Sequence, residues 1–364
     1  MIVKDIIKIL NDKYPFCYAE DYDNVGLIVG DDQYKVNGII VCLDTIESVV
    51  NEAIQKKCNV IVSFHPIIFD GLKKLTNKNY VERIVNKCIK NKISIIAIHT
   101  AMDNSIVGVN KIICDKLELQ DSKILVPKKG TIKKITTYMP SKNLEAIKTK
   151  LFNSGAGTIG NYDECSFAVN GIGTFRGNER SKPVIGIKGI QTEVKEVKIS
   201  FTFPMHKETE ILSALKINHP YDEFAYEIIS LDNINQNIGL GMIGKLNKSM
   251  DEEKFISHLK NKMNTKLVRH SEFIGKKIKT VAVLGGSGSF AIDNAINSKA
   301  DAYITSDLKY HDFFKADKKI LLTDIGHYES EQYTKNVIHT FLTEKITNFA
   351  IVLTETNSNP VKYS

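Results

Sequence analysis

Short apolar runs alternate with amphipathic stretches from the start of the chain to about residue 128. The apolar runs have the length of buried strands and lie at residues 38–43, 60–63, 93–98 and 123–126. The amphipathic stretches have the periodicity of helices and lie at residues 47–57, 81–92 and 107–117. Such alternation predicts an α/β domain with a largely parallel sheet, in which functional groups gather beyond the carboxyl ends of the strands.

The pattern changes between residues 129 and 238. There, strand-like and helix-like segments follow in the order β-α-β-β-α-β, at residues 132–138, 143–153, 165–175, 194–204, 206–215 and 224–229. This order is typical of ferredoxin-like α+β domains. From residue 239 the α/β pattern returns, with strand-like runs at 280–284, 302–305, 319–323 and 350–353. We therefore predict a core α/β domain built from residues 1–128 and 239–364, with a ferredoxin-like domain inserted at 129–238.

Composition and charge indicate an ordinary soluble globular protein. Of the 364 residues, 43% are hydrophobic and 25% are charged, and the net charge of +7 comes from lysines spread along the chain. Because a nucleic-acid interface usually concentrates basic residues on one face, this balance only weakly favours nucleic-acid binding. No apolar run approaches the ~20 residues that span a bilayer. The six cysteines lack a C-x-x-C motif and are typical of reduced, buried thiols, so we predict a cytoplasmic protein without membrane contact.

Candidate metal ligands occur where apolar runs end. His327 and Glu331 lie four residues apart at the start of a predicted helix that runs to about residue 347, so both side chains leave the same face. Imidazole and carboxylate groups together suit zinc, iron or manganese, although such a pair is also common on a solvated helix surface. His65 and Asp103 each follow a buried strand by a few residues, where ligands from neighbouring strands converge.

Two glycine-rich segments match phosphate-binding loops only in part. Residues 155–162 lack the Gly-Lys-Ser/Thr ending of a P-loop, and we interpret them as a flexible surface loop. Residues 285–288 lack the full G-x-G-x-x-G spacing, and we interpret them as a tight turn from a strand into a helix.

Several motifs in the same order resemble the NIF-three-like family over essentially the whole chain. In the core they are Asp23-Asn24-Val25-Gly26-Leu27, Phe64-His65-Pro66, His99-Thr100 with Asp103, Gly285-Gly286-Ser287-Gly288, Asp307 with Lys309-Tyr310-His311, and Gly326-His327-Tyr328-Glu329-Ser330-Glu331. In the middle segment, residues 160–167 and 219–222 resemble the PII/CutA-like insert of the longer bacterial members. The resemblance implies a dinuclear divalent-metal site in the core domain and a toroidal homohexamer.

The resemblance implies a ligand set, from which this chain departs at one position. The matching ligands are His65, Asp103, His327 and Glu331. Of these, Glu331 is implied to bridge the two metals. The family normally has two consecutive histidines before the proline, whereas Phe64 stands at the first of these positions here. One metal therefore loses a protein ligand: it binds weakly with extra water, His99 replaces the missing group, or the site holds a single ion. Otherwise His99 is expected to orient a ligand.

Bacterial members of the family are commonly labelled GTP cyclohydrolase I type 2 homologs, which implies a metal-dependent hydrolase acting on a nucleotide or a related small molecule. Lys309, Tyr310 and His311 are candidate catalytic groups, because histidine titrates near neutral pH and lysine binds phosphate. The alternative is that this triplet forms a structural turn or an oligomer contact. Two other functions stay open: a non-catalytic metal-binding regulatory or structural ring protein, and a ring that associates with nucleic acid.

Overall fold

The computed structural model describes residues 1–362 and contains two compact units. The core unit combines Met1–Pro127 with the chain from Gln236 onward, and the insert consists of Lys128–Asn235. The core unit thus has an N-terminal half and a C-terminal half, which the insert separates in sequence. The sequence pattern places the corresponding boundaries at residues 128 and 238.

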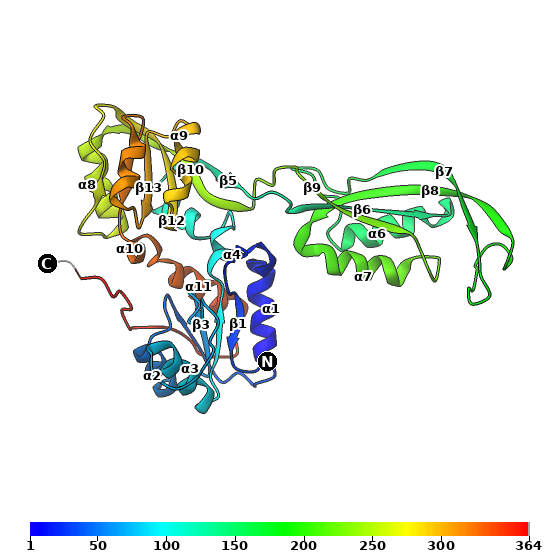
Figure 1. The fold of residues 1–364 in the computed structure, drawn as a ribbon, viewed down its shortest axis with the longest axis horizontal. Helices are drawn as coiled ribbons and strands as arrows, with labels where there is room; N and C mark the ends of the chain where they lie inside the picture. Colours follow the sequence, from blue (N-terminus) through cyan, green and yellow to red (C-terminus); the bar gives the residue numbers. More distant parts are fainter. Residues whose placement is uncertain (363–364) are drawn as a thin grey trace. The chain divides into compact units, whose positions relative to one another are not determined.

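Each half of the core unit builds its own β-sheet, and each sheet takes one strand from the other half (Figure 1). The N-terminal sheet has the strand order β1-β4-β3-β2-β15. Its strands are β1 (Gly26–Val29), β2 (Ile39–Cys42), β3 (Val60–Ser63), β4 (Ser94–Ala97) and β15 (Ile351–Leu353). β15 comes from the C-terminal half and runs parallel to β2, whereas β1 is antiparallel to β4.

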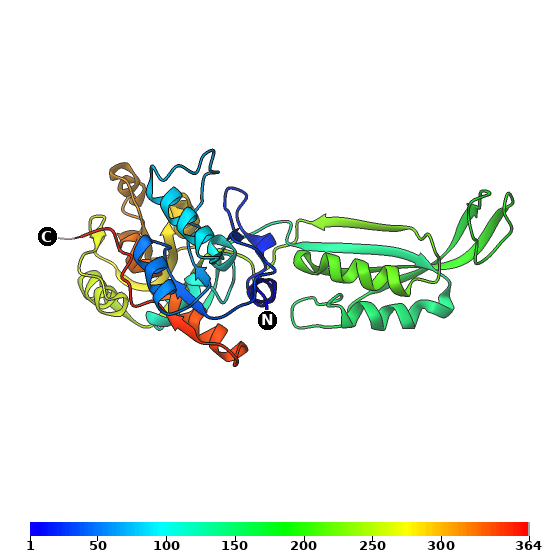
Figure 2. The same cartoon turned by 90° about the horizontal axis from the view of Figure 1, so that it is seen from below.

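Helices cover both faces of the N-terminal sheet (Figures 1 and 2). Every residue of β2, β3 and β4 is buried, as expected for strands with both faces covered. Ile39 and Val41 join a cluster that contains residues of α1 and α11, while Ile40 and Cys42 join a cluster that contains residues of α2 and α3. The helices of this region are α1 (Val3–Lys13), α2 (Glu47–Gln55), α3 (Tyr80–Lys90), α4 (His99–Asp103), α5 (Val109–Lys116) and α11 (Thr334–Lys345).

The C-terminal sheet has the strand order β11-β14-β13-β12-β10-β5. Its strands are β5 (Gln120–Pro127), β10 (Gly239–Asp251), β11 (Arg269–His270), β12 (Lys277–Ser287), β13 (Ala302–Ser306) and β14 (Leu321–Asp324). β12, β13 and β14 are parallel, whereas β10 is antiparallel to both β12 and β5. The helices of this half are α8 (Glu252–Met263), α9 (Ile292–Asn297) and α10 (His327–Glu331). The N-terminal sheet is thus largely parallel, as predicted from the pattern of residues 1–128, with β1 as its antiparallel strand. The C-terminal sheet is mixed in direction.

The long helix predicted from residue 327 to about 347 is divided into α10 and α11. α10 ends at Glu331 and α11 begins at Thr334. Thr334 Oγ1 donates a hydrogen bond of 2.6 Å to the carbonyl oxygen of Glu331, and such bonds compete with the regular helical ladder. In the part of the chain that the structure describes, no helix combines the length and apolarity needed to cross a bilayer.

The insert has the β-α-β-β-α-β order that the sequence predicts. Its elements are β6 (Ile132–Met139), α6 (Leu144–Asn153), β7 (Phe167–Arg176), β8 (Gln191–Pro204), α7 (Glu208–Asn218) and β9 (Tyr226–Leu231). The antiparallel sheet has the order β7-β8-β6-β9, and α6 and α7 lie side by side against it (Figures 1 and 2). Ile135 and Ile199 of the sheet pack with Leu151 of α6 and Leu215 of α7 in a separate core.

Candidate metal centre

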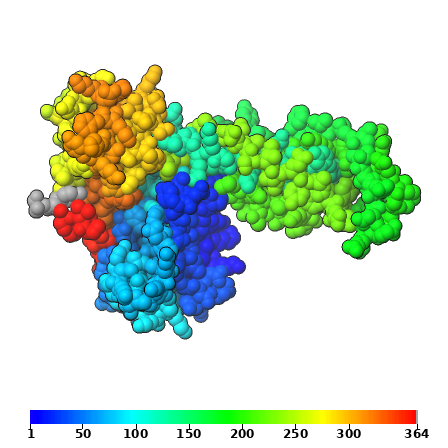
Figure 3. All heavy atoms as spheres, in the orientation of Figure 1, coloured from blue at the N-terminus to red at the C-terminus, as the bar shows by residue number. Residues whose placement is uncertain are grey.

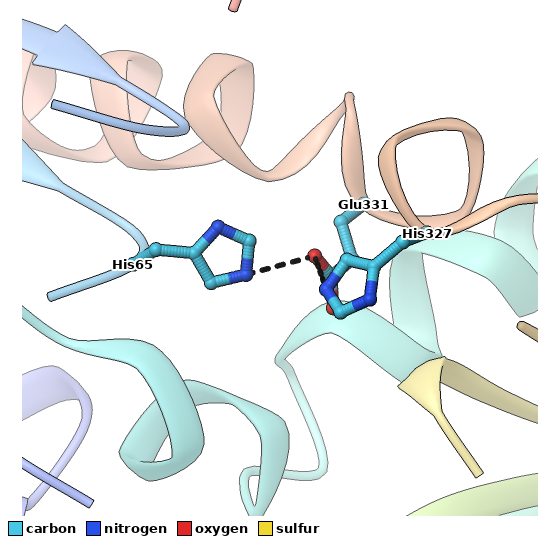
Figure 4. Close-up of side chains that lie close together, drawn as sticks. All are labelled: His65, His327 and Glu331. Atoms are coloured by element: carbon cyan, nitrogen blue, oxygen red, sulfur yellow. Dashed lines mark ion pairs between the residues drawn. The ribbon is translucent and has the colours of Figure 1, made fainter. Parts of the chain in front are cut away.

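Three side chains from both halves of the core unit converge at one place, as Figure 4 shows. His65 follows β3, and His327 and Glu331 are the first and last residues of α10. One ligand atom from each of the three lies within 4.8 Å of the others. The carboxylate Oε2 of Glu331 lies 3.1 Å from His65 Nε2 and 3.2 Å from His327 Nε2.

Backbone hydrogen bonds hold His65 in line with the N-terminal sheet. Beyond the end of β3, the amide of Phe64 donates to the Cys42 carbonyl at 3.1 Å, and the amide of His65 donates to the Leu43 carbonyl at 3.0 Å. The pairing of β2 with β3 therefore continues to His65. The imidazole therefore lies just beyond the carboxyl end of β3. In sheets with parallel strands, functional groups gather at this edge.

Two glycines allow α10 to bring its ligands to the same place. Gly326, between β14 and α10, has φ +91°, a conformation that residues with a Cβ rarely adopt. Gly286, at the end of β12, has φ +73°, and a Cβ there would lie 2.5 Å from Glu331 Oε1. The 285–288 segment is thus part of a long strand and the turn that follows it, and it provides the space that Glu331 occupies.

Each histidine of the cluster is held by a second carboxylate on its other ring nitrogen. His65 Nδ1 lies 2.7 Å from Asp44 Oδ1, and His327 Nδ1 lies 2.6 Å from Asp307 Oδ2. Carboxylates in this position fix the ring orientation and direct Nε2 toward a metal ion. The sequence pattern assigns no role to Asp44 and no ligand-orienting role to Asp307; the available signal is that each follows a buried strand by one or two residues.

The charges of the cluster favour an ion pair between the imidazoles and Glu331. Burial by itself would lower the pKa of His65, but Glu331 and Asp44 raise that pKa to about 10. Burial would likewise lower the pKa of His327, but Glu331 and Asp307 raise it to about 11. Burial would raise the pKa of Glu331, but the two histidines hold it well below its usual range. A cation would have to compete with protons for these nitrogens, so its binding would release protons.

Asp103 lies in the wall of a cavity of about 340 Å³ that His65, His327 and Glu331 also line. Its Oδ1 is buried and has no hydrogen-bond partner among the described residues. Burial and the nearby charge of Glu331 raise the pKa of Asp103 well above its ordinary value. The unpartnered oxygen of Asp103, the Glu331 carboxylate and the two imidazoles are together a donor set that fits a divalent cation.

Phe64 and His99 lie beside the cluster. The Phe64 ring is fully buried in the core, with its centroid 4.9 Å from that of His65 and 5.5 Å from that of His99. His99 Nδ1 lies 2.8 Å from Asp23 Oδ1, and Asp23 also accepts hydrogen bonds from the Thr100 amide and hydroxyl. His99 also lines the cavity of Asp103, so its Nε2 is the ring nitrogen available to a ligand there.

The structure does not bring Lys309, Tyr310 and His311 to the cluster. The three side chains are exposed at the start of the 3₁₀ segment η5 (Tyr310–Ala316), and none of them lines the cavities described here. The preceding residue explains this orientation: Leu308 is buried, and its amide donates a 3.0 Å hydrogen bond to Asp324 Oδ2.

A second cavity, of about 430 Å³, is also lined by His65 and His327. Asp44, Asp307 and Glu329 contribute carboxylates to its wall, and residues of the C-terminal segment form another part of the wall. The two histidines thus take part in two cavities of the core unit.

These features define an α/β protein with a cluster of two half-buried histidines and one buried carboxylate, contributed from both halves of the core unit. Residues 1–360 match the Duf34/NIF3 (NGG1p interacting factor 3) family, and the chain belongs to that family. It is 34% identical over 369 residues to the "GTP cyclohydrolase 1 type 2 homolog" of Bacillus subtilis, with 99% of this chain and 98% of the relative covered. It is similar to the protein of the same description in Staphylococcus epidermidis, at 33% identity over 367 residues and full coverage of both chains.

Solved structures agree with this assignment. A Bacillus cereus protein related to NIF3 has a TM-score of 0.87 and 34% identity to this chain, with 100% of this chain and 99% of that chain covered. A Staphylococcus aureus protein has a TM-score of 0.78 and 30% identity, with the same coverage. The family resemblance inferred from the motifs is therefore confirmed.

Proposed function

We propose that this protein is a divalent-metal-dependent hydrolase that acts on a nucleotide or a related small molecule. The observation that carries the proposal is the approach of Glu331 Oε2 to His65 Nε2 and His327 Nε2, at 3.1 and 3.2 Å. Two ligands held at ~2.1 Å from a tetrahedral ion lie about 3.4 Å apart, so the three groups need little movement to bind one. Mixed imidazole and carboxylate ligands suit zinc, iron or manganese.

The chain's own residues would orient the ligands and handle a proton. A divalent cation in this position would supply an acidified water and polarise the group under attack. Asp44 and Asp307 hold Nε2 of each histidine toward Glu331. Asp103 Oδ1, buried and without a hydrogen-bond partner among residues 1–362, is available to the cation or to a proton. The buried ring of Phe64 excludes water from the side of the cluster that it covers.

We further propose one tightly held ion per chain. Phe64 offers no ligand atom, and His99 is held on one ring nitrogen by Asp23. A second position would rely on Asp103 and the remaining nitrogen of His99, which makes it the weaker of the two. The toroidal homohexamer implied by the family resemblance and the likeness of the insert to PII/CutA proteins stay predictions.

One observation favours a second candidate, a non-catalytic metal-binding ring protein. The polar triplet Lys309, Tyr310 and His311, the candidate group for proton transfer, lies outside the cavity walls that contain the cluster. Turnover separates the two candidates, since both require the same metal ligands.

The experiment compares wild type with Glu331→Gln and with Glu253→Gln, an exposed residue of α8. Each is loaded with Zn²⁺, Mn²⁺ or Fe²⁺ and assayed on a panel of nucleotides. GTP comes first, because the relatives from Bacillus subtilis and Staphylococcus epidermidis are called GTP cyclohydrolase 1 type 2 homologs. We expect turnover in wild type and Glu253→Gln and a loss of at least ~100-fold in Glu331→Gln, since the ligand charge is removed. Metal binding without turnover on the whole panel would instead support the non-catalytic candidate.

A further inference from the structure

The C-terminal segment after β15 is fixed to the N-terminal half of the core unit by Glu52. This carboxylate of α2 accepts hydrogen bonds from Thr354 Oγ1 at 2.6 Å, the Glu355 amide at 3.0 Å and Thr356 Oγ1 at 2.8 Å. The Thr354 amide also donates to the Val41 carbonyl at 3.0 Å and so extends the pairing of β15 with β2. These hydrogen bonds therefore fix the position of the chain as far as residue 356.

Beyond this point, two side chains of the segment reach the residues that support the metal cluster. Ser358 Oγ donates to Asp44 Oδ2 at 2.5 Å, and the other oxygen of Asp44 lies 2.7 Å from His65 Nδ1. Asn359 Nδ2 donates to Glu329 Oε1 at 3.1 Å. Glu329 is buried and lies on α10 between the two ligands of that helix.

The segment thus connects the two halves that supply the ligands. Figure 3 shows the red C-terminal residues on the surface of the core unit, between its blue-to-cyan N-terminal half and its orange C-terminal half. Asn359, Pro360 and Val361 line the 430 Å³ cavity together with His65 and His327. Local hydrogen bonds from the amides of Asn359 and Val361, to Asn357 Oδ1 and Asn359 Oδ1, stabilise the turn.

We propose that residues 358–361 form a clasp that sets the position of His65 relative to α10 and thereby controls how tightly the metal is held. The inference rests on the proposed metal site. Ser358 is a positioning residue. Its hydroxyl donates a hydrogen bond to one carboxylate oxygen of Asp44, and this orients the other oxygen toward His65 Nδ1. Asp44 is about one-third exposed, and without Ser358 its carboxylate is free to turn toward water. Loss of a group that orients a ligating histidine, as Asp44 orients His65, weakens metal binding by about 10–100-fold, and Ser358 acts through that group.

The test is a titration of the metal-free, full-length protein with Co²⁺, which reports affinity and, through its visible absorption, ligand geometry. We compare wild type with Ser358→Ala, Ser358→Thr and Ser298→Ala, the last at an exposed serine after α9. We expect the Kd for Co²⁺ to rise about 10-fold in Ser358→Ala, the lower end of the range for loss of the orienting carboxylate itself, with a changed absorption spectrum. Ser358→Thr keeps the hydroxyl and should return the Kd to within a few-fold of wild type, and Ser298→Ala should match wild type.

A second variant removes the clasp and keeps its anchor. A chain that ends at Thr356 retains the hydrogen bonds to Glu52, and we expect its Kd for Co²⁺ to be at least as weak as that of Ser358→Ala. Thermal unfolding of the metal-free proteins shows whether each variant is folded. If the shortened chain is not folded, the comparison of Ser358→Ala with Ser358→Thr tests the clasp by itself. Wild-type affinity and spectrum in Ser358→Ala would overturn the clasp but leave the metal site standing, whereas no Co²⁺ binding in wild type would overturn both.

Discussion

At the scale of single residues, position 286 requires glycine for two reasons, its backbone conformation and the space beside it. Its φ of +73° suits glycine, and a Cβ would lie 2.5 Å from Glu331 Oε1, closer than real side chains approach one another. The buried carboxylate would have to move, and with it the oxygen that faces both histidines. The identity of this residue is therefore tied to the metal cluster and not only to the turn.

We expect Gly286→Ala to lower metal occupancy by at least about fivefold and to destabilise the fold by about 1–3 kcal/mol. Gly275→Ala is a matched control, because Gly275 has φ +72° with open space around its Cβ position. The control should show a similar backbone penalty of about 1 kcal/mol and wild-type metal occupancy. Elemental analysis and urea unfolding measure the two effects. Equal metal content in the two variants would show that Glu331 does not depend on Gly286.

The residue scale also shows what the sequence can and cannot indicate about the site. His65, His327 and Glu331 are predictable because strand ends and a four-residue helical spacing place ligands at known positions. The roles of Asp44 and Asp307 are not predictable from the sequence, since aspartate after a strand is also common in ordinary turns. Lys309, Tyr310 and His311 are exposed while the neighbouring Leu308 is buried, and no local pattern in the sequence reveals which of these side chains face the cluster.

At the scale of elements, α2 carries the anchor of the C-terminal segment. Burial by itself would raise the pKa of Glu52, but hydrogen bonds from Thr354, Glu355, Lys56 and Thr356 lower it from 4.5 to about 2. The folded state therefore binds this proton less readily than the unfolded chain does. The stabilisation is complete above pH ~4.5 and is lost as the pH falls toward about 2.

We expect Glu52→Gln to cost about 1–2 kcal/mol of folding stability at pH 7, because a charged acceptor of several hydrogen bonds is lost. The difference from wild type should shrink as the pH falls from about 5 toward 2. Glu47→Gln, on the exposed surface of the same helix, should cost no more than about 0.5 kcal/mol at any pH. Urea unfolding at pH 7 and pH 3 makes the comparison. A difference between Glu52→Gln and wild type that does not change with pH would contradict this role of the carboxylate.

Element positions are predictable where the hydrophobic pattern is strong. β2, β3, β4 and β13 lie on short apolar runs, and the segment order of the insert follows from alternating strand and helix patterns. β10 escapes prediction because Gly239, Gly241 and Gly244 and several polar residues interrupt its pattern. At the division between α10 and α11, Thr334 donates a side-chain hydrogen bond to the Glu331 carbonyl, a local feature that periodicity does not report.

At the scale of the whole molecule, the exchange of strands explains why one site takes ligands from segments far apart in sequence. β15 completes the N-terminal sheet, and β5 completes the C-terminal sheet. Each half therefore needs a strand of the other, and the two halves fold as one unit although the insert lies between them in sequence. Strand pairing across such distances leaves no periodic signal, so the sequence pattern does not indicate that β5 and β15 each join the sheet of the other half.

The metal content per chain tests the central claim most directly. Elemental analysis is made on wild type, His327→Ala and His311→Ala after purification with Zn²⁺ or Mn²⁺ and removal of free metal. His311 is the matched control, because it is exposed and lies outside the cavity walls. We predict about one ion per chain in wild type and in His311→Ala, and a loss of at least about fivefold in His327→Ala, since a ligand is removed. Unchanged metal content in His327→Ala, or none in wild type, would contradict the proposed site.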